Sequence, residues 1–373
     1  YFPILRAFSQ ESQRFKHQQG TSWAQTLTSG VGDEIPLIAT GRNGDEVLVF
    51  ESSNPEVAEI NGSSIHIHSK GSAQISVRAQ GDEFLNDDNT GVTRDLFVTW
   101  SGSGTKEDPY LISNPNQLDS MRYNLTAHYK LTADIDLSAI DSWTPIGDNT
   151  NRFKGSFDGN GYVIRNLTIF SPDSYKGLFG VFEPDTPGDE IMNVGLVDVD
   201  ILGGSHLGGV AGNVYSGVIR NTFVTGTIKG TTYIGGIAGR IFDDSAIEDC
   251  YSTVTVQATG SRQAGIAGAA DASTIIRCFA TGMITVEDGS LGLGGVAGRL
   301  AEGATLSNSA AINPGIKGAY QASRLVGDFS GSSISNSYAW EEMYVNDTQI
   351  ESGDATSTPV SYTHLTLPTK RIV

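Results

Sequence analysis

The stretch that decides the fold is Leu207-Gly208-Gly209-Val210-Ala211-Gly212. It returns as Ile234-Gly235-Gly236-Ile237-Ala238-Gly239, Ala264-Gly265-Ile266-Ala267-Gly268 and Gly294-Gly295-Val296-Ala297-Gly298, roughly every thirty residues. Shorter forms stand at Gly177-Leu178-Phe179-Gly180 and Leu325-Val326-Gly327. A unit of this length cannot bury its apolar side alone, whereas stacked copies form one continuous core. The repeat therefore predicts a solenoid.

A second signature follows each glycine motif and fixes the period. Apolar residues open it at Ile191, Ile219, Ile247, Ile275, Leu306 and Ile334, so the intervals are 28, 28, 28, 31 and 28 residues. Runs rich in strand-forming residues come next, such as Phe223 to Ile228. Parallel stacking at about 4.8 Å per coil would place equivalent residues above one another. Because parallel crossovers are right-handed, we predict a right-handed parallel β-helix.

The alignment of the repeats predicts which side chains form columns. Asn193, Asn221, Asn308 and Asn336 fall in register and should form an asparagine ladder at a turn. Asp249 and Arg277 take this position in the two middle coils, where their opposite charges could form a stacked pair. The motif glycines are expected to allow close backbone approach and positive φ angles.

Two further columns concern aromatic rings and thiols. Phe223, Tyr251, Phe279 and Tyr338 fall in register, and we interpret them as a structural row on a sheet rather than a platform for sugars. Cys250 and Cys278 come directly before two of these rings. Stacked Cα atoms about 4.8 Å apart are within disulfide range, but parallel Cβ directions suit the bond poorly. We therefore favour buried thiols.

Composition narrows the class of protein. Only 18% of the 373 residues are charged and 45 are glycine, which suits short strands and tight turns and indicates an all-β protein. A net charge of −18 without a basic cluster argues against nucleic acid or anionic membrane as partners. No run of about 18 apolar residues exists to insert into a membrane. The chain begins at Tyr1 without Met, so we expect a piece of a longer protein.

Further motifs carry a resemblance to a known family. They are Tyr110-Leu111-Ile112, Leu131 to Leu137, Trp143-Thr144-Pro145-Ile146-Gly147, Phe153 to Gly161 and Gly177-Leu178-Phe179-Gly180. Together they resemble the GLUG-motif β-helices of bacterial adhesins and of accessory regions in IgA-specific metallopeptidases, over about residues 102 to 340. The resemblance implies extracellular display at the bacterial cell surface, and it brings no catalytic residues with it.

The N-terminal part resembles a different module. Gly32 to Leu37, Ser53 to Ala58 and Gly71 to Val77 resemble bacterial Ig-like domains of the invasin and intimin type, which implies a β-sandwich. The expected domains are 1–15, unplaced or the end of a preceding module; 16–100, the Ig-like sandwich; 101–345, the β-helix, with a short capping helix near 114–124; and 346–373, a disordered tail. Residues 360–369 of that tail resemble the translation of a sequencing adapter.

A search for reactive groups finds no combination typical of a catalytic site. Hydrolysis of glycans needs paired carboxylates on one face, and calcium needs several oxygen ligands. We interpret each candidate as a turn, a solvated ladder or an exposed strand residue, and we expect no catalytic, cofactor-binding or metal-binding residues. The candidates weighed are Asp198 with Asp200, Asp243 with Asp244, the row of Arg220, Asp249 and Arg277, His66 with His68, and Asp134, Asp136, Asp158 and Asn160.

These observations favour a non-catalytic cell-surface adhesin or stalk that binds a host glycan or protein and needs no cofactor. Two alternatives remain open at this point. One is a carbohydrate-active β-helix enzyme, a hydrolase or lyase acting on polysaccharide. The other is an accessory segment of a surface metallopeptidase.

Overall fold

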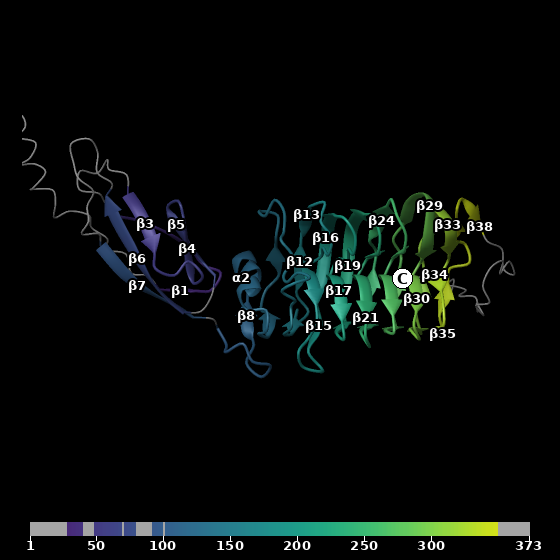
Figure 1. Cartoon of the computed structure of the whole chain (residues 1–373), viewed down its shortest axis with the longest axis horizontal. Helices are drawn as coiled ribbons and strands as arrows, with labels where there is room; N and C mark the ends of the chain where they lie inside the picture. The colour runs from purple at the N-terminus through teal and green to yellow at the C-terminus, as the bar shows by residue number, and fades with distance from the viewer. Residues whose placement is uncertain (1–27, 40–47, 69–70, 80–91, 100, 350–373) are drawn as a thin grey trace, which may run out of the picture. The chain divides into compact units, whose positions relative to one another are not determined.

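The computed structural model describes residues 28–39, 48–68, 71–79, 92–99 and 101–349. Contacts divide the chain into two units, one made of residues 1–103 with 115–124, the other of residues 104–114 with 125–373. The predicted segment 1–15, most of the predicted tail and the adapter-like residues 360–369 lie outside the described residues. Figure 1 labels the strands of both units.

The first unit contains two small sheets. One has the strand order β1-β7-β6-β3 and the other β2-β5-β4, and only the pair β1/β7 is parallel. Alternation buries Ile75 and Val77 in β6, as the sequence pattern predicts. The strands are β1 (Thr28–Gly30), β2 (Glu34–Pro36), β3 (Leu48–Ser52), β4 (Ala58–Asn61), β5 (Ser64–Ile67), β6 (Gly71–Ala79) and β7 (Val92–Thr99).

A short helix groups with this first unit by its contacts. It runs as α2 (Pro115–Ser120) and continues as the 3₁₀ turn η1 (Met121–Tyr123). Its apolar stripe is buried at Leu118 and Met121, and Ser120 Oγ donates a hydrogen bond to the carbonyl of Ile67 at 3.3 Å. Its suggested role as a cap of the solenoid stays a prediction.

The second unit is a parallel β-solenoid, which confirms the predicted architecture. Its strands stack side by side along one axis from β8 to β38, and all their pairings are parallel except that of β37 with β38 (Figure 1). The right-handed sense of the coil stays a prediction. The predicted boundary at residue 345 is too early, because β38 (Thr348–Gln349) returns on β37 (Tyr344–Val345) as a hairpin.

Three sheets form the walls of the solenoid. The first sheet comprises β8 (Tyr110–Ile112), β9 (Tyr129–Leu131), β11 (Phe157–Asp158), β15 (Glu190–Met192), β18 (Val218–Arg220), β22 (Ala246–Glu248), β27 (Thr274–Ile276), β31 (Thr305–Ser307) and β35 (Ser333–Ser335). The second comprises β14 (Phe179–Phe182), β17 (Ala211–Tyr215), β21 (Ala238–Phe242), β26 (Ala267–Asp271), β30 (Ala297–Ala301) and β34 (Val326–Phe329).

The third sheet is the largest, with 16 strands, and it carries the aromatic row. Besides β37 and β38 its strands are β10 (Ile135–Asp136), β12 (Val163–Arg165), β13 (Thr168–Phe170), β16 (Gly195–Leu202), β19 (Phe223–Gly230), β20 (Ile234–Gly235), β23 (Tyr251–Ser252), β24 (Thr255–Ala258), β25 (Gln263–Ala264), β28 (Phe279–Ala280), β29 (Ile284–Gly294), β32 (Ala310–Ala311), β33 (Gly315–Ser323) and β36 (Tyr338–Ala339).

The predicted period is the register of the first sheet. Ile191, Ile219, Ile247, Ile275, Leu306 and Ile334 pair successively across the strands from β15 to β35. The longer interval before Leu306 has two sources. Two extra residues stand between Val286 and Leu293, compared with the equivalent stretch between Ala258 and Gln263 in the preceding coil. A third extra residue lies in the turn after Ala301. Both insertions leave the apolar column intact.

The motif glycines serve close approach, but their predicted positive φ angles are wrong. A Cβ on Gly239 would lie 2.5 Å from the carbonyl oxygen of Gly212, and one on Gly268 would lie 2.5 Å from that of Gly239. Neither has a positive φ. Among the residues that do is the turn column, with 49° at Asn221 and 54° at Arg277. We use this name for the register position of Asn193, Asn221, Asp249, Arg277, Asn308 and Asn336. Side-chain amides and ions at the turn offset the left-handed strain.

Candidate functional site

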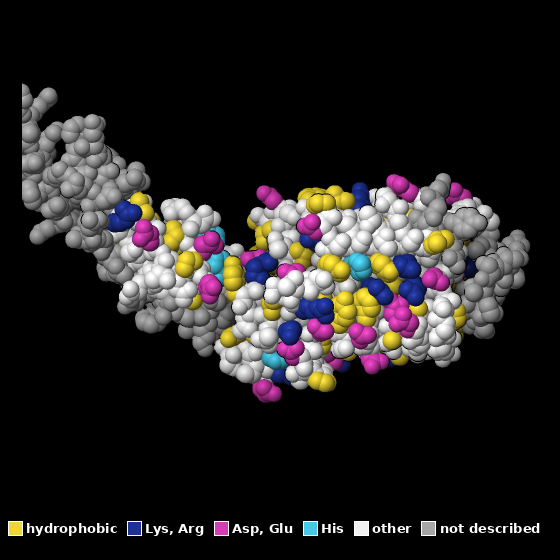
Figure 2. All heavy atoms as spheres, viewed as in Figure 1, with side chains coloured by type: hydrophobic (Ala, Val, Ile, Leu, Met, Phe, Trp, Pro, Cys, Tyr) yellow, Lys and Arg dark blue, Asp and Glu magenta, His cyan; other side chains and the backbone are white. Residues whose placement is uncertain are grey.

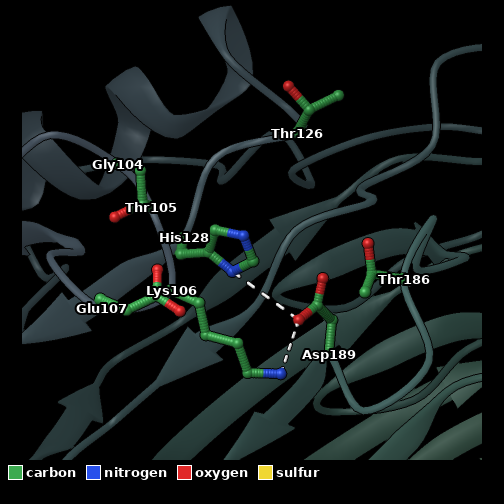
Figure 3. Close-up of a pocket in the computed structure, with 8 residues that line it drawn as sticks. All are labelled: Gly104, Thr105, Lys106, Glu107, Thr126, His128, Thr186 and Asp189. Atoms are coloured by element: carbon green, nitrogen blue, oxygen red, sulfur yellow. Dashed lines mark hydrogen bonds and ion pairs between the residues drawn. The ribbon is translucent and has the colours of Figure 1, made fainter.

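An open polar pocket lies beside the first coils of the solenoid. Its volume is about 390 Å³. Lys106 and His128 both point toward Asp189, which is buried (Figure 3). Lys106 Nζ lies 2.9 Å from Asp189 Oδ1 and donates a second hydrogen bond to the carbonyl of Gly188 at 2.7 Å. The pocket is lined by Gly104, Thr105, Lys106, Glu107, Thr126, His128, Thr186 and Asp189.

His128 and Asp189 of this pocket, together with Ser156 next to His128, are the residue types of a catalytic triad but do not have its arrangement. His128 Nδ1 lies 2.8 Å from Ser156 Oγ and 3.9 Å from Asp189 Oδ1. A triad needs the two partners on opposite ring nitrogens, so that one orients the ring while the other gives up its proton. Here both face the same nitrogen, and Lys106 already pairs with the carboxylate. The group joins the loop at Lys106 to the segment before β15.

A shallow groove crosses the outer face of the largest sheet. Its volume is about 510 Å³. Lys229, Gln257 and Thr285 form one column along it, since each pairs with the next across β19, β24 and β29. Leu202 begins the column and is 45% exposed. The groove is lined by Leu202, Gly203, Lys229, Gly230, Thr231, Gln257, Ala258, Thr259, Thr285, Val286 and Glu287.

A ladder of rings runs along the turns before the second sheet. The ring of Tyr175 lies 4.9 Å from that of His206, which lies 4.7 Å from Tyr233. Arg262 continues the ladder, with its guanidinium 4.9 Å from the Tyr233 ring. Burial, together with the charge of Arg240, lowers the pKa of His206 from 6.5 to about 4. The imidazole is therefore neutral at pH 7 and stacks as an uncharged ring.

Arginines gather beside this ladder on the second sheet. Figure 2 shows basic side chains close to a histidine on the viewed face of the solenoid. Arg240 Nε lies 2.7 Å from Asp271 Oδ2, and the guanidinium of Arg299 lies between Asp271 and Asp328 at 3.6 and 3.7 Å. Because Asp271 is buried, these pairs neutralise a carboxylate within the fold.

The predicted aromatic row exists, with an interruption. Phe223, Tyr251 and Phe279 stack with centroids 5.0 and 4.9 Å apart and planes within 5° of parallel. Ala310 occupies the next position, and Tyr338 follows one coil later. The position of Ala310 follows from the period of the sequence, so the interruption could have been found there.

The thiols are buried and free, as predicted. Cys250 Sγ lies 3.1 Å from the carbonyl oxygen of Glu248, and Cys278 Sγ lies 3.3 Å from that of Ile276. Burial raises the pKa of the Cys250 thiol, with the neighbouring thiol of Cys278 adding to the effect. The Cys250 thiol is therefore protonated and unreactive at neutral pH.

The predicted turn column forms bonded pairs at Asn193 and Asn221 and at Asp249 and Arg277, whereas Asn308 and Asn336 make no side-chain hydrogen bond among the described residues. Asn221 Nδ2 donates to Asn193 Oδ1 at 3.1 Å, and Arg277 Nη2 lies 2.7 Å from Asp249 Oδ2. Hydrogen bonding from Arg277 lowers the pKa of Asp249. Arg220 pairs with Glu190 at 2.5 Å and not with this pair, so the charged row is divided between two partners.

The remaining carboxylates weighed in the sequence take part in structural bonds or face solvent. Asp136 Oδ1 accepts hydrogen bonds from Asn166 Nδ2 at 2.8 Å and Ser138 N at 2.9 Å, and these bonds lower its pKa. Asp158 Oδ1 likewise accepts from Asn160 N and Asn193 Nδ2. Across the described ranges, no three His, Cys, Asp or Glu side chains come together as metal ligands.

The other predicted candidates lie apart from one another. Asp198 and Asp200 are exposed on β16, and the register partners of Asp200 are Thr168 and Thr227. Asp243 and Asp244 form a turn with positive φ. In the first unit, His66 lies 3.4 Å from Glu34, and His68 lies 2.9 Å from Glu59. Nothing brings these groups to one site.

Stacked coils, a glycine column and a turn column together define the class as a parallel β-solenoid. Comparison with protein families agrees with this, since the model of the GLUG motif matches residues 230–257. These residues run from the end of β19 through the second glycine motif to Gln257, which is one period of the repeat.

Similarity to individual proteins is strongest over parts of the chain. This chain is 41% identical over 141 residues to a protein of Evansella cellulosilytica that is provisionally named a Gly-rich membrane protein. The matched region covers 35% of this chain and 16% of that protein. The chain is 38% identical over 162 residues to Halomucin of Haloquadratum walsbyi, covering 39% of this chain and 2% of that protein. The chain thus spans a small part of the length of either relative.

A solved structure matches over a larger share. It is that of a protein of Bacteroides ovatus provisionally named an immunoglobulin A1 protease. The match has a TM-score of 0.58 and 27% sequence identity, and it covers 70% of this chain and 85% of that chain. In the described part of this chain, no helix has the length and apolarity needed to span a bilayer.

Proposed function

We propose that this chain is a non-catalytic segment of an extracellular protein at the bacterial cell surface, acting as an adhesin or as a stalk that displays binding surfaces. One observation carries the proposal. The repeated columns of the solenoid are occupied by glycines, small apolar residues and bonded turn residues, and the charged groups beside them are largely engaged in structural pairs. Such columns supply a rigid scaffold with exposed faces.

Two comparisons support a surface location. One relative is named as a membrane protein, and the family resemblance in the sequence implies display outside the cell. We further propose that the two small sheets of the first unit form an Ig-like sandwich of the kind found in surface proteins. Its antiparallel pairs β3/β6 and β2/β5 support this assignment.

The test combines binding with a search for turnover. The purified chain is applied to a glycan array and to a panel of host proteins, and the same glycans and proteins are then incubated with it and analysed for cleavage. We expect binding without cleavage if the chain is an adhesin, and neither binding nor cleavage if it is a stalk. Depolymerised glycan or cleaved protein would overturn the proposal.

A second candidate function follows from the solved structure. Because this chain covers 85% of a protein provisionally named an immunoglobulin A1 protease, it could serve as an accessory segment of a surface peptidase. Under this candidate the chain alone binds immunoglobulin A1 but leaves it intact. Surface plasmon resonance with immobilised immunoglobulin A1, followed by electrophoresis of the incubated antibody, separates this candidate from binding to glycans.

A further inference from the structure

The aromatic row on the largest sheet lacks one ring. Each ring between Phe223 and Phe279 covers the face of its neighbour, and the first rests on Gly195, where a Cβ would lie 2.3 Å from the Phe223 ring. Only the methyl group of Ala310 follows Phe279. Phe279 is accordingly 39% exposed, whereas Phe223 and Tyr251 are half-buried.

The row resumes with Tyr338, so the missing ring leaves a gap with two aromatic walls. Ala310 pairs with Phe279 on one side and Tyr338 on the other. Two strand spacings of about 4.8 Å put these side chains about 9.6 Å apart. Carbon contacts of about 3.5 to 4.0 Å on both faces of an inserted ring use about 7 to 8 Å, which leaves room for a puckered ring.

The turn column changes at the same coils. Asn193 and Asn221 hydrogen bond to each other, and Arg277 bonds to Asp249. Asn308 and Asn336 are exposed two residues before Ala310 and Tyr338, and within the described chain neither side chain makes a hydrogen bond. Two amides therefore stand beside the gap with both donors and acceptors available.

We propose that the gap of Phe279, Ala310 and Tyr338 binds one pyranose ring of a glycan, with Asn308 and Asn336 as hydrogen-bond partners. This inference rests on the proposed function and names the ligand class of the display surface. A benzene ring would satisfy the walls and leave both amides unbonded. A pyranose presents C–H bonds to the walls and hydroxyl groups at its rim to the amides.

The two walls also predict which pyranose is preferred. A β-glucopyranose carries all its ring substituents equatorially, so both of its faces are made of C–H bonds. The axial hydroxyl of a galactopyranose would face an aromatic ring and lose its hydrogen bonds. We expect glucose-configured chains to bind roughly tenfold more tightly than galactose-configured chains, which is the cost of one misplaced polar group.

Calorimetric titration of the full chain with cellotetraose and with β-1,3-galactotetraose, each ring of which keeps a free axial hydroxyl, tests the proposal. The key variant is Ala310→Phe, which supplies the missing ring. It should weaken cellotetraose binding by about tenfold or more while keeping or raising the melting temperature, since the added ring completes the stack. Tyr338→Ala, which removes a wall, should weaken binding similarly. Phe223→Ala is the matched control, because it removes a ring at the far end of the row. The affinity of this variant for cellotetraose should equal that of the wild type.

Several results would overturn the inference. They are no binding of either saccharide by the wild type, equal cellotetraose binding by Ala310→Phe and wild type, or binding of N-acetyltyrosinamide in place of saccharide. The proposed function is tested separately. Continued binding to other array glycans or host proteins by Ala310→Phe would leave it standing, whereas release of glucose or cellobiose from cellotetraose would defeat the proposed function itself.

Discussion

All six residues of the turn column, none of which is glycine, have positive φ, from 44° to 56°. Backbones in this region cost about 1 to 2 kcal/mol for residues with a Cβ, and asparagine tolerates it best because its amide bonds locally. Asn193, Asn221, Asn308 and Asn336 fit this rule directly. Asp249 and Arg277 depart from it, and their ion pair substitutes for the amide ladder.

Substitution of Asn221 tests this account. Asn221→Ala removes the hydrogen bond to Asn193 and leaves a Cβ at positive φ, so we expect a loss of about 1 to 2 kcal/mol of stability by urea unfolding. Asn221→Gly is the control. It lacks the same hydrogen bond but adopts positive φ freely, and its loss should be smaller. Equal losses for the two variants would mean that backbone strain is not what the asparagine relieves.

His206 makes stability depend on pH. Its pKa of about 4 in the folded chain lies below the ordinary 6.5, so the unfolded chain binds the proton more readily between these values. Stability should therefore fall as the pH drops from about 6.5 to about 4, by roughly 1 to 2 kcal/mol for a half-buried ring.

The control for this prediction is His206→Phe, which keeps a ring between Tyr175 and Tyr233. Thermal unfolding of both proteins at pH 7.5 and pH 5 should show a smaller loss for the variant at pH 5. If the two proteins lose stability in parallel, the pH dependence belongs to other groups.

At the scale of the element, the glycine column of Gly212, Gly239, Gly268 and Gly298 allows successive strands of the second sheet to approach closely. A methyl group on Gly239 would lie 2.5 Å from Gly212 O and 2.6 Å from Leu207 N. Both are backbone atoms and cannot turn away. We expect Gly239→Ala to cost roughly 1 to 3 kcal/mol, as overpacked substitutions do, measured by chemical unfolding.

A glycine outside the column provides the comparison. Gly303 has a φ of 83° and no atom within 4 Å of an added Cβ. Gly303→Asn introduces a residue that tolerates this conformation, so its effect should stay below about 0.5 kcal/mol. An equal loss at both glycines would show that strand spacing is not what Gly239 protects.

Elements with equal spacing could be predicted from the sequence, and those with unequal spacing could not. The apolar column of the first sheet, the two thiols and the aromatic row all keep the intervals of the repeat, so the spacing in the sequence predicted which residues align. Tyr175, His206 and Tyr233 are separated by 31 and 27 residues and differ in type, which hides their ladder. The pair of Lys106 and Asp189 joins residues 83 apart and has no periodic signal.

At the scale of the whole molecule, each coil of the solenoid contacts mainly its neighbours. Stability is then approximately a sum over coils and their interfaces. Removal of residues 247–274 takes out one period, because Ile247 pairs with Ile275 and Ala246 with Thr274. The strands on either side of the deletion can therefore meet in the same register.

We expect the protein without residues 247–274 to fold with unchanged strand content by circular dichroism and a lower melting temperature. Removal of residues 247–260, half a period, is the matched control. It joins Ala246 of the first sheet to Ser261 before β25 of the third sheet, so the stacked register is lost and cooperative unfolding should be prevented. Similar behaviour of the two deletions would contradict the stacked register.

The unbroken register of the first sheet also bears on how such a chain changes over generations. Each coil presents the same backbone register to the next coil. Unequal crossing-over between gene segments that encode neighbouring coils therefore yields a longer or shorter solenoid whose coils still pair. The length of the solenoid can thus vary in steps of about 4.8 Å, the width of one strand, without redesign of the core. Side chains on the outer faces are free to diverge coil by coil, and one replacement of a ring by alanine is enough to open a place for a ligand.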